Sequence, residues 1–289
     1  MGTVAQRPRK VGLIDVGGGL RGAYGAGVLD RCIDDGIRFD YCIGVSAGSA
    51  NVAAFLAGQK GRNLRFYADY SARPAFMGLG ALRASGSFLD VEYVYGTLSQ
   101  EDGEDPLDVA AVREAGVPCE LVATDARTGA ACYFDVAELS AGDLGAIKAS
   151  SSVPVACKPY RWRGREFCDG GLSDPIPLRR ALGAGCERVV VVLTRPKAFR
   201  RKSLRDKAAA RLAAREHPRM AELLELRAST YNAQLDYALV LERSGVALVV
   251  APDDIEGMGT LTRDRNKIVA LYAKGYADGA AIAPFMRRS

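Results

Sequence analysis

Apolar residues are gathered in short runs along the chain, and most runs end in a polar or glycine-containing turn. Four of these runs predict strands, over 11–16, 41–45, 188–193 and 245–250. The third reads RVVVVL and is apolar at nearly every position rather than at every second one. Such a run indicates a strand that is covered on both faces, as in a parallel sheet between helices.

Two further strands are predicted over 118–124 and 132–135. Segments of helical character follow the first two strands, over 22–34 and 49–58. Strands that alternate with helices predict an α/β fold, a three-layer α/β/α sandwich with a mostly parallel central sheet. A chain of 289 residues is within reach of one such unit, so we expect 1–289 to form a single domain.

Composition narrows the class of protein. Hydrophobic residues make up 48% of the chain and charged residues 25%, with a net charge of +5, which is typical of a globular protein with a sizeable core. No apolar run is long enough for a transmembrane helix, and no signal-peptide or myristoylation pattern is recognised. The seven cysteines include no C-x-x-C pair, which indicates free thiols rather than a disulfide framework or a zinc site. These features predict a cytoplasmic protein.

A glycine-rich turn between a strand and a helix occupies the middle of 11–30, VGLIDVGGGLRGAYGAGVLD. Gly17, Gly19 and Gly22 have the G-x-G-x-x-G spacing of a dinucleotide-binding turn. That site also needs an acidic residue about 20 positions further on, at the C-terminal end of the next strand. Asp40 has the separation but precedes its strand, at the opposite edge of the sheet. A nucleotide-binding α/β protein stays an alternative at this point.

The sequence GVSAGS has the spacing of a nucleophile elbow, with Gly44 and Gly48 two positions either side of Ser46. It lies between a predicted strand and a predicted helix, as the elbow requires. The following helix directs its N-terminal N–H groups toward negative charge that forms near the serine. The pattern predicts Ser46 as a nucleophile, and a chance glycine–serine turn is the alternative.

A hydroxyl nucleophile needs a base, and the single histidine of the chain is His217. It lies in the charged stretch LAAREHPRM, directly before Pro218, which favours a position on the surface. The sequence therefore predicts that the base is a carboxylate, with a histidine base as the less favoured alternative.

Asp169 is the candidate carboxylate. It follows the second arm of a predicted hairpin, whose turn is at 163–164, and it precedes Gly170 and Gly171. An aspartate that is held ionised within hydrogen-bond reach takes a serine proton directly. An ordinary Asp-Gly turn is the alternative explanation, and Asp174 is a nearby alternative base.

Three of these pieces, GGGLRG at 17–22, GVSAG at 44–48 and DGG at 169–171, together resemble the patatin-like phospholipases. These are serine acyl hydrolases with a Ser-Asp dyad and no catalytic histidine. The stretch ASSSVPVACKP at 149–159 resembles a fourth block of the family, although Cys157 stands where many members have an aromatic residue. This difference at Cys157 bears on the shape of the pocket that would bind the acyl chain.

The resemblance covers 11–180, and 181–289 are expected to complete the sheet and add a basic helical segment. It implies hydrolysis of lipid acyl esters, such as those of phospholipids, with Ser46 as nucleophile, Asp169 as proton acceptor and no metal or cofactor. The backbone N–H groups of Gly17, Gly18 and Gly19 would form the oxyanion hole. The supporting motif residues are Arg21, Gly22, Gly44, Gly48, Gly170 and Gly171. A catalytically silent, lipid-binding regulatory member is the alternative within the family.

Two other segments bear on the substrate. Ten Lys or Arg residues lie in Arg195–Arg219 against Asp206 and Glu216, and they form either a solvated face or a patch that attracts an anionic membrane surface. Nucleic acid is not an expected partner, because the segment has one aromatic residue, Phe199, and no nucleic-acid-binding module. The irregular, aromatic-rich stretch 63–105 is either an ordinary insertion or a cover over a ligand cleft.

Overall fold

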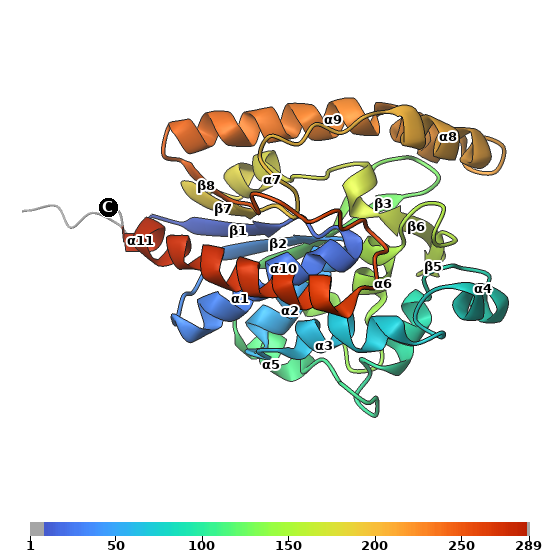
Figure 1. Ribbon diagram of the computed structural model, residues 1–289, viewed down its shortest axis with the longest axis horizontal. Coiled ribbons are helices and arrows are strands. Elements are labelled where there is room, and N and C mark those ends of the chain that lie inside the picture. Colours follow the sequence, from blue (N-terminus) through green and yellow to red (C-terminus); the bar gives the residue numbers. More distant parts are fainter. Residues whose placement is uncertain (1–8, 288–289) are drawn as a thin grey trace, which may run out of the picture.

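A computed structural model describes residues 9–287 (Figure 1). Its centre is an eight-stranded sheet in the order β5-β6-β3-β2-β1-β7-β8, with β4 paired to β3 outside this path. The strands are β1 (Val11–Asp15), β2 (Tyr41–Val45), β3 (Cys119–Asp125), β4 (Ala131–Asp135), β5 (Tyr160–Trp162), β6 (Arg165–Asp169), β7 (Arg188–Val192) and β8 (Ala247–Val250). Each strand predicted from the sequence is present, with its ends displaced by at most two residues.

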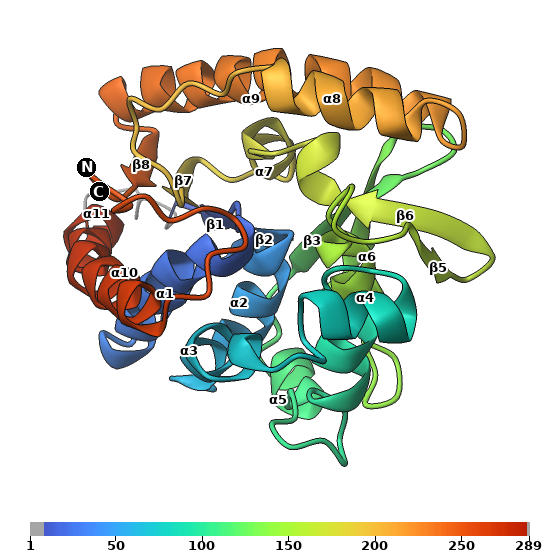
Figure 2. The ribbon, with the colours of Figure 1, turned by 45° about the vertical axis from the view of Figure 1, so that its right-hand side comes forward.

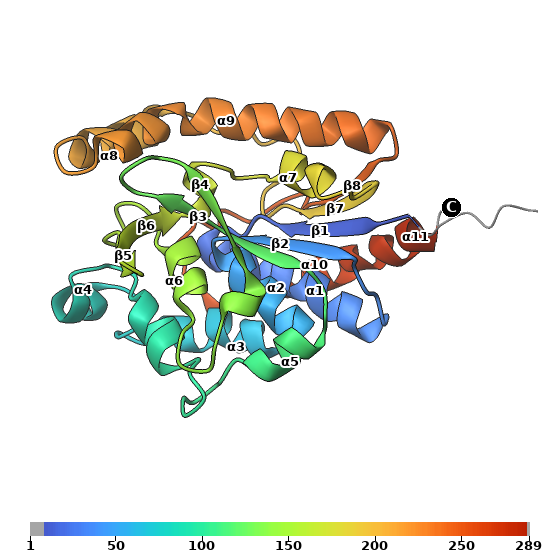
Figure 3. The ribbon, with the colours of Figure 1, turned by 180° about the vertical axis from the view of Figure 1, so that it is seen from behind.

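Five neighbouring strands, β3, β2, β1, β7 and β8, run parallel. At one end of the sheet the direction changes, because β4 and β6 both pair antiparallel with β3, and β5 pairs antiparallel with β6. Figure 3 shows this end from behind, with β3, β4 and β6 close to helix α6 (Gly145–Ser151). The predicted mostly parallel sheet is confirmed.

Both faces of the parallel strands are buried, which explains their continuous apolar sequences. In β1, Leu13 packs into one core cluster and its neighbour Ile14 packs into another. In β7, Val190 belongs to the first cluster and Val191 to the second. The alternation follows from the period of two in a strand, and here both sets of side chains meet helices.

Helices form the two outer layers (Figure 2). Helices α7, α8 and α9 lie on one side of the sheet, and α1, α2 and α10 lie on the other with the smaller helices. The helices are α1 (Ala23–Asp34), α2 (Ala47–Leu56), α3 (Arg62–Ala68), α4 (Leu79–Ser85), α5 (Val109–Glu114), α6 (Gly145–Ser151), α7 (Leu178–Gly183), α8 (Leu204–Ala213), α9 (Pro218–Arg243), α10 (Arg265–Asp278) and α11 (Ile282–Arg287). The predicted three-layer α/β/α sandwich is confirmed.

Strands from the two halves of the sequence join in this sheet, since β7 and β8 extend the parallel series of β1 and β2. The continuity supports the proposal that the chain forms one unit. All seven cysteines are free thiols. Within the part of the chain that the structure describes, no helix has both the length and the hydrophobicity needed to cross a bilayer.

Candidate active site

Ser46 occupies a strained turn between β2 and α2, with φ 56° and ψ −130°. A Cβ atom on Gly44 would lie 2.5 Å from Cα of Ser49, and one on Gly48 would lie 2.2 Å from the carbonyl oxygen of Asp15. Neither position can accept a larger residue without a shift of the backbone. A strained turn of this kind is what a nucleophile elbow requires, and strained backbone is concentrated at functional sites.

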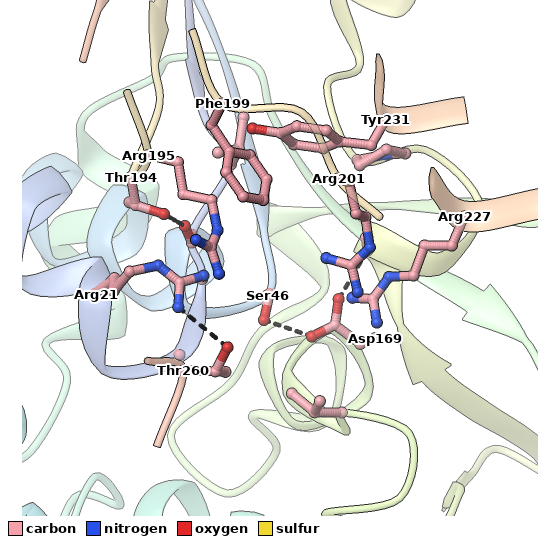
Figure 4. A pocket seen from close by; sticks show the side chains of 17 residues that line it. Arg21, Ser46, Asp169, Thr194, Arg195, Phe199, Arg201, Arg227, Tyr231 and Thr260 are labelled. Atoms are coloured by element: carbon pink, nitrogen blue, oxygen red, sulfur yellow. Dashed lines mark hydrogen bonds between the residues drawn. The ribbon is translucent and has the colours of Figure 1, made fainter. Parts of the chain in front are cut away.

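The hydroxyl of Ser46 donates to the carboxylate of Asp169, with Oγ and Oδ2 2.5 Å apart (Figure 4). Asp169 is the last residue of β6 and is 3% exposed. Its other oxygen, Oδ1, accepts the N–H of Gly171 at 2.7 Å. Burial raises the pKa of the Asp169 carboxyl, and the positive charge of Arg227 opposes this rise. The two predicted residues, 123 positions apart, are therefore brought into direct contact.

Ser150 in α6 holds the turn at Ser46 in place through hydrogen bonds. Its Oγ accepts the backbone N–H of Ser46 at 2.9 Å and donates to the carbonyl oxygen of Val122 at 2.5 Å. The bond connects the turn to β3, the strand that separates β2 from β6. No role for Ser150 was predicted, although it lies in the serine triplet of the stretch that resembles a family block.

The glycine loop follows β1, and Gly17, Gly18 and Gly19 have φ values of 61°, 133° and 60°, in the region that favours glycine. The N–H of Gly17 donates to Oδ1 of Asp15 at 2.9 Å, so this predicted oxyanion donor is already bonded. Within residues 9–287, the N–H groups of Gly18 and Gly19 have no protein acceptor. Gly18 and Gly19 are therefore the donors that the loop can offer to a ligand.

Asp15 anchors this loop. It is fully buried, and Oδ2 accepts from the amide nitrogen of Asn51 at 2.9 Å. Asn51 also donates to the carbonyl oxygen of Gly22 at 3.0 Å and accepts from the hydroxyl of Tyr67. Burial raises the pKa of Asp15 to about 6. Sequence analysis did not single out Asp15, but a carboxylate at the end of an otherwise apolar strand is a usable signal.

Ser46 lies where two pockets meet. The first, which we call the arginine pocket, contains the side chains of Arg21, Arg195, Arg201 and Arg227 together with Ser46 and Asp169 (Figure 4). The second, the apolar pocket, begins at Ser46 and has a hydrophobic lining. Its side chains include Leu20, Tyr67, Phe76, Met77, Leu89 and Val94. Gly19, Ser46, Val153 and Thr260 line both pockets.

Nearly half of the residues that form the wall of the apolar pocket come from 63–105, so this segment covers a cleft beside Ser46. Cys157 stands behind that wall, where its thiol donates to the carbonyl oxygen of Leu89 at 3.3 Å. Its effect on the pocket is therefore indirect.

The remaining motif residues surround the loop and the carboxylate. Arg21 is 5% exposed, and its Nη1 donates to Oγ1 of Thr260 at 3.1 Å. Gly22 joins the glycine loop to α1. Gly170 packs against β3, where an added Cβ would lie 2.1 Å from the carbonyl oxygen of Val122.

The alternative site residues lie elsewhere. His217 precedes α9 and lines neither pocket. Asp174 accepts from Tyr133 at 2.6 Å and from Gln234 at 2.7 Å, which connects β4 to α9. Asp40 accepts the N–H of Val11 at the start of β1, whereas the glycine loop follows the end of that strand. The acid that a dinucleotide site needs is therefore at the wrong end of β1.

The basic segment does not form one outward surface. Arg195 and Arg201 line the arginine pocket, Lys197 pairs with Glu242 at 2.6 Å and Arg200 pairs with Asp236 at 2.7 Å. Lys197 and Arg200 are exposed, and further exposed basic side chains are those of Lys202, Lys207, Arg211, Arg215 and Arg219. Part of the segment therefore turns toward Ser46, and the two alternatives of a solvated face and a membrane-attracting patch concern its exposed residues.

Comparison with known proteins decides the family. The model of the family described as patatin-like phospholipase matches residues 16–182, more than half of the chain and the part that holds Ser46 and Asp169. The chain belongs to the patatin-like phospholipase family. A second model, of a domain of unknown function (DUF6363), matches residues 217–288, which include Arg227 and Thr260.

Two relatives of this patatin-like chain illustrate the similarity. The uncharacterized protein YjjU of Escherichia coli K12 is 30% identical over 194 residues, 66% of this chain and 53% of that protein. The uncharacterized NTE family protein Rv1063c of Mycobacterium tuberculosis H37Rv is 25% identical over 175 residues, 61% of this chain and 46% of that protein. The chain thus spans about half the length of these relatives. The crystal structure of VipD from Legionella pneumophila aligns with a TM-score of 0.49 at 14% identity, covering 96% of this chain and 67% of VipD.

Proposed function

We propose that this patatin-like chain is a lipid acyl hydrolase, with Ser46 as the nucleophile and Asp169 as its base. The observation that carries the proposal is the 2.5 Å hydrogen bond between Ser46 Oγ and Asp169 Oδ2, at a strained turn open to two pockets. Membership of the family supports hydrolysis of acyl esters in general.

The reaction follows from the positions of these groups. Ser46 Oγ attacks the ester carbonyl carbon while Asp169 takes its proton. The N–H groups of Gly18 and Gly19 donate to the oxygen that becomes negative, and a donor of this kind contributes about 3–4 kcal/mol to transition-state stabilisation. Asp169 returns the proton to the departing alcohol, and then activates the water that releases the acyl group from Ser46.

The apolar pocket is the proposed acyl site. It begins at Ser46, and its lining is hydrophobic over Tyr67, Met77 and Val94. Burial of an acyl chain there contributes about 0.8 kcal/mol per methylene. The ester of an amphiphilic lipid, apolar on one side and polar on the other, fits the junction between the two pockets.

We also propose contact between α8 and an anionic membrane surface. Leu204 and Leu212 on this helix are 80% and 76% exposed, and Lys207 and Arg211 are exposed beside them. Exposed apolar side chains next to basic ones are typical of helices that lie in a membrane interface. The cytoplasmic location expected from the free thiols stays a prediction.

A fluorophosphonate probe tests the proposed nucleophile. We expect mass spectrometry to find one labelled peptide, containing Ser46, and Ser46→Ala to abolish labelling. Ser229→Ala, which removes an exposed serine from α9, is the matched control and keeps full labelling. Labelling at another residue, or equal labelling of Ser46→Ala, would contradict the proposal.

A further inference from the structure

Four guanidinium groups surround the polar side of Ser46. They come from distant parts of the chain: Arg21 follows the glycine loop, Arg195 follows β7, Arg201 precedes α8 and Arg227 lies in α9. Figure 4 shows all four side chains directed toward the space beside Ser46. This convergence is not required by the attack of a serine on an ester.

The lining of the arginine pocket holds more guanidinium groups than carboxylates. Asp169 is the one carboxylate among the described residues that line the arginine pocket. Asp206, buried behind the pocket, accepts from Arg201 at 2.7 Å and lies 3.8 Å from Arg227. The pocket lining itself thus brings four guanidinium groups together with one carboxylate.

Arg21 is the buried member of this group, and Arg195, Arg201 and Arg227 are half-buried. Arg21 is 5% exposed, and its Nε has no hydrogen-bond partner among the described residues. Burial and the charge of Arg195 lower the pKa of Arg21 to about 9, and burial and the charge of Arg201 lower the pKa of Arg227. Burying like charges together costs free energy, and a bound anion offsets that cost. A buried guanidinium donor that has no protein partner indicates a site that can bind an anion.

The arginine pocket is also continuous with the proposed reaction centre. It shares Gly19, Ser46 and Thr260 with the apolar pocket. With an acyl chain in the apolar pocket and its carbonyl carbon at Ser46, the alcohol side of the ester lies in the arginine pocket. An anion bound there is therefore a part of the leaving group.

We infer that the arginine pocket binds the phosphate of the leaving alcohol, so that the preferred substrate is an acyl ester of an alcohol that carries a phosphomonoester. The inference rests on the proposed function and specifies its substrate class. A dianionic phosphomonoester suits a pocket lined by four guanidinium groups and one carboxylate, and guanidinium groups recognise its oxygens through paired N–H donors.

Choline-type headgroups fit less well. The pocket has a net positive charge, which disfavours a quaternary ammonium group. Its aromatic side chains are Phe199 and Tyr231, and the guanidinium of Arg195 lies 4.1 Å from the centre of the Phe199 ring. That face of the ring is occupied by a protein cation, so it does not serve as a cage for a ligand cation.

The phosphate group takes no part in the bond changes. Ser46 Oγ bonds to the carbonyl carbon, the bond from this carbon to the alcohol oxygen breaks, and Asp169 protonates that oxygen. The phosphorylated alcohol then leaves with its phosphate ester intact, and water releases the acyl group.

Turnover of three octanoyl esters, kept below their aggregation concentrations, tests the inference. They are octanoyl-glycerol 3-phosphate, octanoylglycerol and octanoyl-glycerophosphocholine. We expect kcat/KM for the phosphomonoester to exceed that of each of the others by at least about tenfold, the usual effect of a hydrogen bond to a charged group. Equal values for the three esters would overturn the inference and leave the proposed function standing.

Variants of the pocket arginines test whether the preference for the phosphomonoester arises in the arginine pocket. Arg201→Gln and Arg227→Gln should each reduce the ratio of kcat/KM for phosphomonoester over octanoylglycerol by at least about tenfold. The ratio is the measured quantity because Arg227 also acts on Asp169 and changes the rate with every ester. Arg243→Gln, an exposed change on the same helix, is the matched control and keeps the wild-type ratio. A ratio unaffected by both pocket variants would overturn the assignment.

Inhibition separates a leaving-group site from a site for free phosphate. We expect sn-glycerol 3-phosphate to compete with octanoylglycerol and to bind more tightly than inorganic phosphate. Non-competitive inhibition by inorganic phosphate, with no preference among the esters, would overturn the inference in favour of a regulatory anion site.

If no ester is hydrolysed and Ser46 is not labelled, the proposed function fails, and the pocket is then tested alone. Calorimetry of Ser46→Ala with sn-glycerol 3-phosphate should show binding that Arg201→Gln weakens by at least about tenfold. Absence of binding to Ser46→Ala would overturn the inference.

Discussion

Nη1 of Arg21 donates to Oγ1 of Thr260 at 3.1 Å, although 239 positions separate the two residues in the chain. The carbonyl oxygen of Thr260 also accepts the N–H of Leu20 at 2.9 Å. The segment between β8 and α10 therefore holds the end of the glycine loop by two bonds. The position of Gly18 and Gly19 relative to Ser46 depends on this contact.

Removal of the Thr260 hydroxyl should disturb that position. Thr260→Val keeps the shape of the side chain and the backbone hydrogen bond to Leu20. It removes the acceptor of Arg21 Nη1, so the buried guanidinium loses one hydrogen bond. We expect kcat/KM for a short-chain ester to fall about tenfold, the lower range for a hydrogen bond to a charged group. Thr260→Ser retains the hydroxyl and should keep near-wild-type activity. Equal activity of the Val and Ser variants would show that this bond does not matter to the loop.

Asp169→Asn should reduce esterase activity at least ~100-fold, because the amide cannot take the proton of Ser46. His217→Ala should keep most of the activity, since His217 lines neither pocket. Initial rates with a chromogenic short-chain ester measure both variants. Comparable losses in the two would restore a Ser-His mechanism.

The pH profile follows from the burial of Asp169. Burial raises the pKa of its carboxyl, and the base acts only when ionised, so kcat/KM should be lost as pH falls through this raised pKa. The acid limb is expected above the ordinary aspartate value of about 3.9. Arg227 lowers the pKa of Asp169, so Arg227→Gln should move the acid limb to higher pH. A limb that moves to lower pH, or that also moves in Arg243→Gln, would contradict this assignment.

Chain-length preference should respond to the mouth of the apolar pocket. Leu261 lines this pocket and is 37% exposed, so a larger residue can be placed there without overpacking the core. Leu261→Trp should reduce kcat/KM for an octanoyl ester about tenfold relative to an acetyl ester, which corresponds to two methylenes excluded from burial. Leu226→Trp, an exposed change on α9, is the control. A parallel loss with both esters would argue against an acyl site here.

Contact with membranes should depend on the outward residues of α8. Replacement of Lys207 and Arg211 by glutamine should weaken binding to anionic vesicles roughly 30-fold, at about 1 kcal/mol per basic residue. The wild-type protein should lose binding as salt increases, because the Debye length shortens from about 10 Å at 0.1 M to 3 Å at 1 M. Co-sedimentation at two salt concentrations measures both effects. Identical sedimentation of variant and wild type would mean that this face is only solvated.

The strands are the part of the fold that the sequence predicts best. A strand covered on both faces is apolar at nearly every position, so β1, β2 and β7 each begin at the predicted residue. Helix α9, with 26 residues, is harder to recognise. Its buried positions include Ala221, Ala228 and Ala238, and alanines give little contrast with polar neighbours, so no apolar stripe is visible.

The elbow is predictable because its requirements are local, whereas the partner of Ser46 is not. Asp169 reaches Ser46 because β6 runs antiparallel to β3, with Asp169 opposite Ala123, and β3 lies beside β2. The order of the strands in the sheet cannot be predicted from the hydrophobic pattern of any single segment. The resemblance to a family, rather than periodicity, is what associated Ser46 with Asp169.

The arginine pocket is beyond what sequence patterns can predict. Arg195 and Arg201 belong to a basic run, and such runs are mostly solvated. Their inward direction depends on the path of the chain after β7, and the position of Arg227 depends on how α9 lies across the sheet. Among 39 Lys and Arg residues, nothing in the sequence distinguishes these three.

The chemistry and the recognition proposed for this site occupy different stretches of the chain. Ser46, Asp169 and the glycine loop lie within 16–182, whereas three of the four pocket arginines and Thr260 come after β7. Substitutions in the later stretch can therefore alter which alcohol is released while Ser46, Asp169 and the glycine loop stay unchanged in sequence. In a hybrid of two such proteins, the headgroup preference should follow the origin of the C-terminal part. The N-terminal part, which holds Ser46 and Asp169, should supply the acyl-transfer chemistry in either case.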